Sequence, residues 1–175
     1  SIHVSGPIIT WHTKRGRAFL NRLAQHRRFW RAWGSLGIGI ALVVMVGFGL
    51  VVLLSALAIG LSPEQAANSP IKNPQNALVI PGVNEYLPPS VAPEIIAGLL
   101  IGMVVHEGGH GLLCRVEDID IESMGIAMFS FIPIGAFVEP DEDDQMRANR
   151  GAQTRMFAAG VTNNFAVTAI TFALL

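Results

Sequence analysis

The sequence has 175 residues, of which 51% are hydrophobic and 14% are charged, whereas soluble proteins carry about 25% charged residues. A formal net charge of −1 gives no argument for a nucleic-acid partner, so none is expected. The single cysteine, Cys114, cannot form a disulfide within the chain and identifies no compartment. Composition therefore favours a membrane protein over a soluble domain.

The two ends of the sequence indicate a fragment of a longer membrane protein. The chain begins with Ser1 rather than methionine, and Leu175 lies inside an apolar run. The alternative is a complete small protein that ends within the bilayer.

Residues 1–35 are basic and contain all three tryptophans. The spacing of residues 15–33 favours an amphipathic helix on a membrane surface, with its aromatic side chains at the interface. A DNA-binding arm is the competing interpretation, and the apolar segment that follows disfavours it. The basic residues are Lys14, Arg15, Arg17, Arg22, Arg27, Arg28 and Arg31.

Three apolar stretches predict membrane-spanning helices. Residues 36–61 contain no charge and exceed the roughly 20 residues needed to cross a bilayer. Residues 91–114 form a second span, and residues 156–175 form a third that is still apolar at its end. The fold class expected is an integral membrane protein, mainly α-helical, with about three spans in this sequence.

The segments between the spans have different chemistry. Residues 62–90 hold six of the ten prolines and predict an extracytoplasmic loop, with residues 78–80 as a short strand or an interfacial dip. Residues 115–155 contain two apolar stretches within 119–138 that predict paired strands, followed by an acidic loop.

Charge asymmetry predicts the orientation in the membrane. Eleven of the twelve lysines and arginines lie before the first span or between the second and third, and only Lys72 lies in the 62–90 loop. The positive-inside rule therefore predicts a multi-pass cell-membrane protein whose N terminus, in this sequence, is cytoplasmic.

The second span contains the motif His106-Glu107-Gly108-Gly109-His110. On a helix, residues four apart share one face, so both imidazoles can reach one metal ion. The bare motif fixes only three positions and often occurs by chance in soluble helices. Inside an apolar span, however, three polar side chains are costly unless they have a function or partners.

Zinc is the metal expected, one ion per chain, because neutral histidine nitrogens are its usual ligands. Glu107 is then placed to accept a proton from water and return it to the leaving amine, which is the chemistry of peptide hydrolysis. A third protein ligand is needed. Glu139 and Asp141 are candidates within the sequence, but we expect this ligand beyond Leu175.

Three stretches, in this order and spacing, resemble the site-2 protease family of intramembrane zinc metalloproteases in its archaeal or bacterial form. The first is residues 105–111, Val-His-Glu-Gly-Gly-His-Gly, and the second is residues 132–140, Ile-Pro-Ile-Gly-Ala-Phe-Val-Glu-Pro. The third is residues 157–165, Phe-Ala-Ala-Gly-Val-Thr-Asn-Asn-Phe, which is similar to the family's Ala-Gly-Pro-x-x-Asn-Phe segment.

The resemblance implies roles for individual residues. His106 and His110 would be zinc ligands, Glu107 the general base, and Asn164 a catalytic residue that holds the substrate or its oxyanion. A carboxamide carries both a donor and an acceptor, which independently suits that role. The 132–138 segment would be a membrane-dipping strand whose edge binds an unwound substrate. The substrate-binding residues expected there are Pro133, Gly135, Ala136 and Phe137.

Two departures from the family pattern are present. Val161 stands where the family usually has proline, although the register of Asn164 is kept. The family's Asn-x-x-Pro stretch ending in Asp-Gly, which supplies the third zinc ligand, does not occur in the sequence. Activity of this fragment by itself is therefore not expected.

Three functions remain open. The first is an intramembrane protease that cuts transmembrane protein substrates. The second is a non-catalytic relative in the membrane that binds zinc or helices. The third is a transporter that relays metal through His106, Glu107 and His110, which the small number of spans disfavours.

Overall fold

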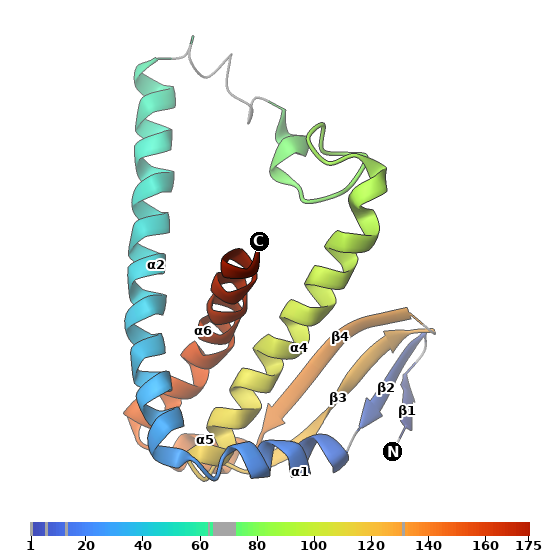
Figure 1. Cartoon of the computed structure of the whole chain (residues 1–175), viewed down its shortest axis with the longest axis vertical. Helices are drawn as coiled ribbons and strands as arrows, with labels where there is room; N and C mark the ends of the chain where they lie inside the picture. The colour runs from blue at the N-terminus through green and yellow to red at the C-terminus, as the bar shows by residue number, and fades with distance from the viewer. Residues whose placement is uncertain (1, 6, 13, 63, 65–72, 131) are drawn as a thin grey trace. The chain divides into compact units, whose positions relative to one another are not determined.

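A computed structural model describes residues 2–5, 7–12, 14–62, 64, 73–130 and 132–175 (Figure 1). The chain divides into two compact units. The sheet unit consists of residues 1–42 and 100–175, and the loop unit consists of residues 43–99.

Three long helices dominate the chain: α2 (Arg27–Leu61), α4 (Ala92–Val116) and α6 (Arg150–Leu174). Each is long and apolar enough to cross a membrane, with mean hydropathies of 2.8, 1.5 and 1.4 in its most apolar window. Most apolar side chains of α2 are exposed in the structure, as expected of a helix whose natural surroundings are lipid.

Two of these helices begin earlier than the sequence predicts. α2 starts at Arg27 instead of residue 36, and α6 starts at Arg150 instead of residue 156. The side chain of Asn149 caps α6 by accepting a 2.8 Å hydrogen bond from the amide of Ala152. Arginine is a good helix former, so each helix continues into the basic residues that precede its apolar segment. The first charged residue marks the edge of the apolar segment and does not mark the end of the helix.

The sheet contains four antiparallel strands in the order β1-β2-β3-β4, all of them in the sheet unit. β3 (Ile121–Phe129) and β4 (Ile132–Pro140) form the paired strands expected within residues 119–138. β1 (Ile2–Ser5) pairs with β2 (Ile8–His12), and β2 pairs with β3 from Ile8↔Phe129 to His12↔Gly125.

The prediction of an amphipathic helix over residues 15–33 is therefore wrong in part, and residues 1–35 are not one surface segment. Residues 2–12 contribute two strands, and α1 (Lys14–Leu23) ends before α2 begins at Arg27. The short strands are rich in β-branched residues, but β3, which joins β2 to the sheet, lies more than 100 residues away in the chain, so the local pattern gives no sign of that pairing.

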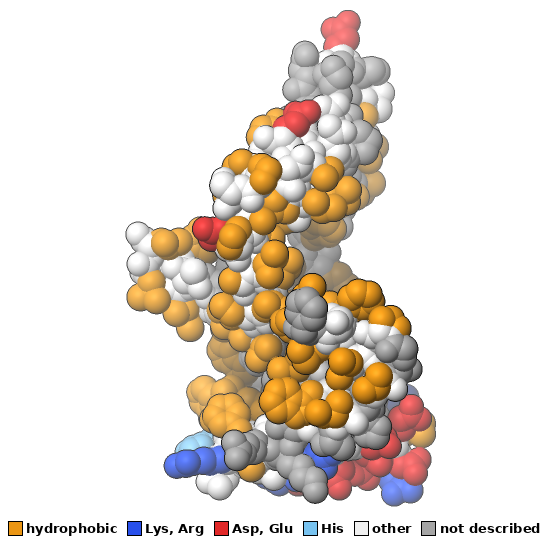
Figure 2. Space-filling model, turned by 90° about the vertical axis from the view of Figure 1, so that its right-hand side faces the viewer, with side chains coloured by type: hydrophobic (Ala, Val, Ile, Leu, Met, Phe, Trp, Pro, Cys, Tyr) orange, Lys and Arg blue, Asp and Glu red, His pale blue; other side chains and the backbone are white. Residues whose placement is uncertain are grey.

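Exposed apolar side chains cover much of the sheet, while the charged side chains of the sheet unit gather at the end that holds α1 and α5 (Glu142–Arg147) (Figure 2). A surface divided in this way suits a sheet that dips into lipid from a polar boundary. The exposed apolar residues of the sheet include Ile2, Val4, Trp11, Phe129, Ile132 and Ile134.

The loop unit contains two short 3-10 helices, η2 (Pro74–Ala77) and η3 (Pro89–Val91). The buried side chain of Asn84 organises the loop, since it donates to the carbonyls of Asn76 and Leu78 and accepts from the amide of Tyr86. Residues 78–80 form neither helix nor strand. Within the predicted 62–90 loop, residues 63 and 65–72 lie outside the described residues.

The hydrophobic core lies where α1, the last turns of α4, the start of β3 and the first turns of α6 meet. It fixes α4 against α6 at the level just beyond the histidine motif. The buried residues are Leu20, Ala24, Leu112, Leu113, Cys114, Val116, Ile119, Ile121, Met156 and Ala159.

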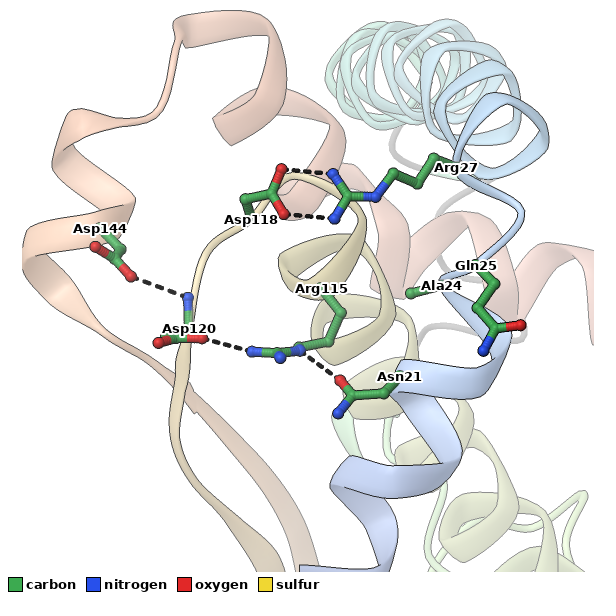
Figure 3. A pocket seen from close by; sticks show the side chains of 8 residues that line it. All are labelled: Asn21, Ala24, Gln25, Arg27, Arg115, Asp118, Asp120 and Asp144. Atoms are coloured by element: carbon green, nitrogen blue, oxygen red, sulfur yellow. Dashed lines mark hydrogen bonds and ion pairs between the residues drawn. The ribbon is translucent and has the colours of Figure 1, made fainter.

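A cavity of about 340 Å³ lies at the charged end of the sheet unit, and ion pairs line it (Figure 3). Arg115 donates to Asn21 and Asp120, while Arg27 forms a two-pronged pair with Asp118. The hydrogen bonds from Arg27 hold the pKa of the Asp118 carboxyl below its usual value. The charges in this cavity are thus largely paired with one another.

Glu117 joins three helices at one buried point. Its side chain is only 3% exposed, and its two carboxylate oxygens lie 3.3 Å from Nε of Arg31 on α2 and 2.8 Å from Nε of Arg155 on α6. A buried carboxylate between two guanidinium groups satisfies charges that would each be costly alone. Glu117 therefore ties α2 and α6 to the end of α4.

We predict that Glu117→Gln destabilises the sheet unit by about 3 kcal/mol, because it leaves two guanidinium groups without their buried counter-charge. This is the lower end of the usual range, since the Arg31 side chain is 49% exposed. Thermal unfolding in detergent measures the effect, with the exposed Glu122→Gln as control. Equal unfolding temperatures for the two variants would contradict this assignment.

Candidate functional site

The histidine motif lies in the second half of α4, where it faces α6. His106 and His110 are four residues apart on α4, and their rings lie edge to face with centroids 4.8 Å apart. One helical turn thus places both imidazoles on the same face, as the spacing predicts.

α6 passes very close to this face of α4. A Cβ atom added to Gly109 would lie 2.8 Å from the carbonyl oxygen of Ala159. A Cβ added to Gly160 would lie 2.6 Å from the Nε2 atoms of both His106 and His110. The two Nε2 atoms therefore converge on one point at the α6 backbone, and they lie no further apart than twice that distance.

The other ring nitrogen of His110 is held by the backbone of α6. Nδ1 of His110 lies 2.8 Å from the carbonyl oxygen of Met156. A carbonyl oxygen only accepts hydrogen bonds, so Nδ1 carries the proton and donates. In the neutral ring, Nε2 is then left with its lone pair, which is the state in which histidine binds a metal.

Glu107 faces the sheet. One of its carboxylate oxygens accepts a 3.2 Å hydrogen bond from the amide of Val138 on β4. One turn earlier on α4, the sulfur of Met103 accepts a 3.0 Å hydrogen bond from the amide of Ala136. β4 therefore runs beside α4 (Figure 1), and two of its edge amides are bonded to side chains of the motif helix.

The four expected substrate-binding residues all lie on β4, and their contacts are with α4, β2 and β3. The amide of Ala136 points at α4, and a Cβ on Gly135 would lie 3.6 Å from the Met103 sulfur. The ring of Phe137 packs edge to face on His12 of β2, with centroids 5.3 Å apart. Pro133 pairs with Met128 beside a bulge in the β3–β4 ladder.

The two asparagines of α6 have separate surroundings. The Asn164 carboxamide lies against His106, with Nδ2 at 3.3 Å from Nδ1 of the imidazole. Asn163 accepts a 2.8 Å hydrogen bond from the indole nitrogen of Trp33 on α2, and its Nδ2 atom would lie only 2.7 Å from a Cβ on Gly109. Asn163 therefore braces the helix crossing, and Asn164 reaches the histidine pair.

Sequence reasoning missed three parts of this site: Gly160, the Met156 carbonyl and Met103. The run of small residues at 158–160 is a signal for close helix packing and could have indicated the crossing. The sequence contains no comparable signal for the roles of a backbone carbonyl, as at Met156, or of a methionine, as at Met103.

No group of three or more His, Cys, Asp or Glu side chains is arranged to hold a metal ion within the part of the chain that the structure describes. The two acidic candidates for a third ligand have other partners. Glu139 accepts a hydrogen bond from the Ser123 hydroxyl, and Asp141 caps α5 by accepting from the amide of Asp144. The cavity of Figure 3 contains none of the motif residues.

Comparison with known proteins identifies a matching family and a distant relative. The family model of Peptidase family M50 matches residues 94–175. An uncharacterized protein of Methanocaldococcus jannaschii is 27% identical over 162 residues, which covers 89% of this chain and 39% of that protein. The chain thus spans about two fifths of the length of this relative.

No solved structure matches the chain. The matched region contains the whole of the histidine motif, the β3–β4 hairpin and α6. M50 peptidases are membrane-associated metallopeptidases, and three helices here are long and apolar enough to cross a membrane. Residues 94–175 of this chain are therefore similar to Peptidase family M50, the site-2 protease family that the sequence resembles.

Proposed function

We propose that this protein is an intramembrane zinc metalloprotease that hydrolyses peptide bonds within transmembrane segments of other proteins. The observation that carries the proposal is the convergence of the His106 and His110 Nε2 atoms at Gly160, with Glu107 next to His106 in the same helix. The match to a family of metallopeptidases supports the same chemistry.

The residues present suit zinc. His110 has its Nδ1 atom bonded to a carbonyl, which orients the ring and leaves Nε2 to bind the metal. Two histidines and a third protein ligand from another part of the protein would hold the ion, with one position left for a reactant. When bound, zinc supplies a Lewis acid that polarises the scissile carbonyl and makes water a better nucleophile.

Glu107 is the proton carrier in this proposal. Its carboxylate accepts the proton of the attacking water and returns it to the leaving amine. In the structure that carboxylate accepts from the Val138 amide. This contact holds the Glu107 carboxylate against β4, whose edge is the proposed path of the bound peptide.

The edge of β4 is the proposed binding place for the substrate backbone. A protease site accepts extended chain, and an added strand takes its main-chain hydrogen bonds from an open edge. The amides of Ala136 and Val138 belong to that edge and are bonded to Met103 and Glu107. A substrate strand would replace both acceptors, which also releases Glu107 for catalysis.

The proposed setting is the cell membrane, with the N terminus of this chain in the cytoplasm. His106 lies about 21 Å along α4 from Ala92 and about 15 Å from Val116, at 1.5 Å per residue. In a core about 30 Å thick, cleavage would fall within the bilayer and nearer its cytoplasmic side. The distribution of lysine and arginine supports this orientation.

We predict that Glu107→Gln lowers the rate of cleavage by about 10²–10⁴-fold while zinc binding is retained, because the amide keeps the shape of the side chain but cannot accept the proton. Turnover of a transmembrane substrate by the full-length protein and its zinc content are measured together. Glu94→Gln, at an exposed position in the first turn of α4, is the control. Normal turnover in Glu107→Gln would favour a non-catalytic role for this glutamate.

We predict that Gly160→Ala weakens zinc binding by about 10–100-fold or more. A loss of about this size is usual when the groups that orient a metal ligand are disturbed. The new methyl group would lie 2.6 Å from both Nε2 atoms, so the rings have to move apart. Gly108→Ala is the matched control, because a Cβ there meets nothing within 4 Å. Competition with a zinc chelator gives both affinities, and equal values would contradict the proposed position of the ion.

A further inference from the structure

The carboxamide of Asn164, on α6, lies within hydrogen-bond distance of His106. Its Nδ2 atom lies 3.3 Å from Nδ1 of the imidazole. Its Oδ1 atom is buried and has no hydrogen-bond partner in the described structure. A buried carbonyl oxygen without a donor is uncommon in folded proteins, and it calls for a physical reason.

The contact also has a consequence for His106. An amide nitrogen only donates, so in this orientation Nδ1 of His106 accepts and the ring proton sits on Nε2. That arrangement removes the lone pair from the nitrogen that points at Gly160 beside Nε2 of His110. His106 would then differ from His110, whose Nδ1 donates to Met156.

One rotation of the carboxamide by 180° about its Cβ–Cγ bond removes both difficulties. It exchanges the oxygen and the nitrogen, which occupy nearly the same space. Oδ1 then accepts from Nδ1–H of His106, and Nε2 recovers its lone pair. The amide nitrogen takes the buried position without a partner, where it can donate to a substrate carbonyl or to a developing oxyanion.

We propose that Asn164 is a positioning residue for His106, in addition to the contact with substrate expected from the sequence. Its oxygen selects the ring tautomer with the proton on Nδ1 and so prepares Nε2 for the metal, as the Met156 carbonyl does for His110. The inference rests on the proposed zinc site. It assigns one end of a single carboxamide to the metal ligand and the other end to the substrate.

Two substitutions at Asn164 separate the two ends. Asn164→Asp keeps an acceptor for Nδ1–H and has no donor, so zinc affinity is retained or raised while cleavage is impaired. Asn164→Leu has a similar volume and no acceptor, so zinc affinity falls by about 10–100-fold. Asn163→Asp is the matched control, since it keeps an acceptor for Trp33 and does not reach His106.

The experiment measures zinc affinity by chelator competition in the full-length protein and its three variants, together with substrate cleavage. If Asn164→Asp and Asn164→Leu lose zinc affinity equally, the carboxamide has only a structural role and the proposal is overturned. If the parent protein binds no zinc, the proposed metal site has failed, which is a different outcome.

The ring tautomer of His106 is a second readout that needs no metal and can be taken on the parent protein alone. Nitrogen NMR of the zinc-free protein, labelled at its histidines, distinguishes a proton on Nδ1 from a proton on Nε2. The proposal requires Nδ1–H in the parent protein and also in Asn164→Asp. A proton on Nε2 in the parent would overturn it, even if Asn164→Leu does not fold.

Discussion

The close approach of α4 and α6 is the constraint on which the site depends. The two helices touch where neither has a side chain, at Gly109 and Gly160, so that Ala159 and the imidazole rings occupy the space. In a bilayer, small residues allow this backbone contact, and van der Waals packing then holds the helices together. A larger side chain at Gly160 would occupy the point to which both Nε2 atoms are directed.

The crossing of α4 and α6 is held in place by groups that have no chemical role in the site. Glu117 binds arginines from α2 and α6, the core around Leu113 packs the helix ends together, and Trp33 donates to Asn163. α6 in turn supplies the carbonyl of Met156 and the carboxamide of Asn164 to the two rings. Packing at the helix ends thus sets the ring geometry that a metal requires.

Much of this arrangement could be predicted from the sequence, because it rests on local periodicity. The four-residue spacing of His106 and His110 and the apolar runs required only the repeat of a helix. The strands at Ile2–Ser5 and Ile8–His12 were missed, since the second of them joins the sheet by pairing with β3 across more than 100 residues and the first pairs only with the second. The hydrogen bond between Glu107 and the Val138 amide could not be predicted either, because it depends on how β4 folds back along α4.

The central claim is that His106 and His110 bind one zinc ion between them. The measurement that tests it most directly is the zinc content of the full-length protein in detergent, beside His110→Ala and the exposed control His26→Ala. The account predicts about one zinc per chain in the parent and in His26→Ala, and loss of zinc in His110→Ala. A well-folded parent without zinc, or undiminished zinc in His110→Ala, would contradict it.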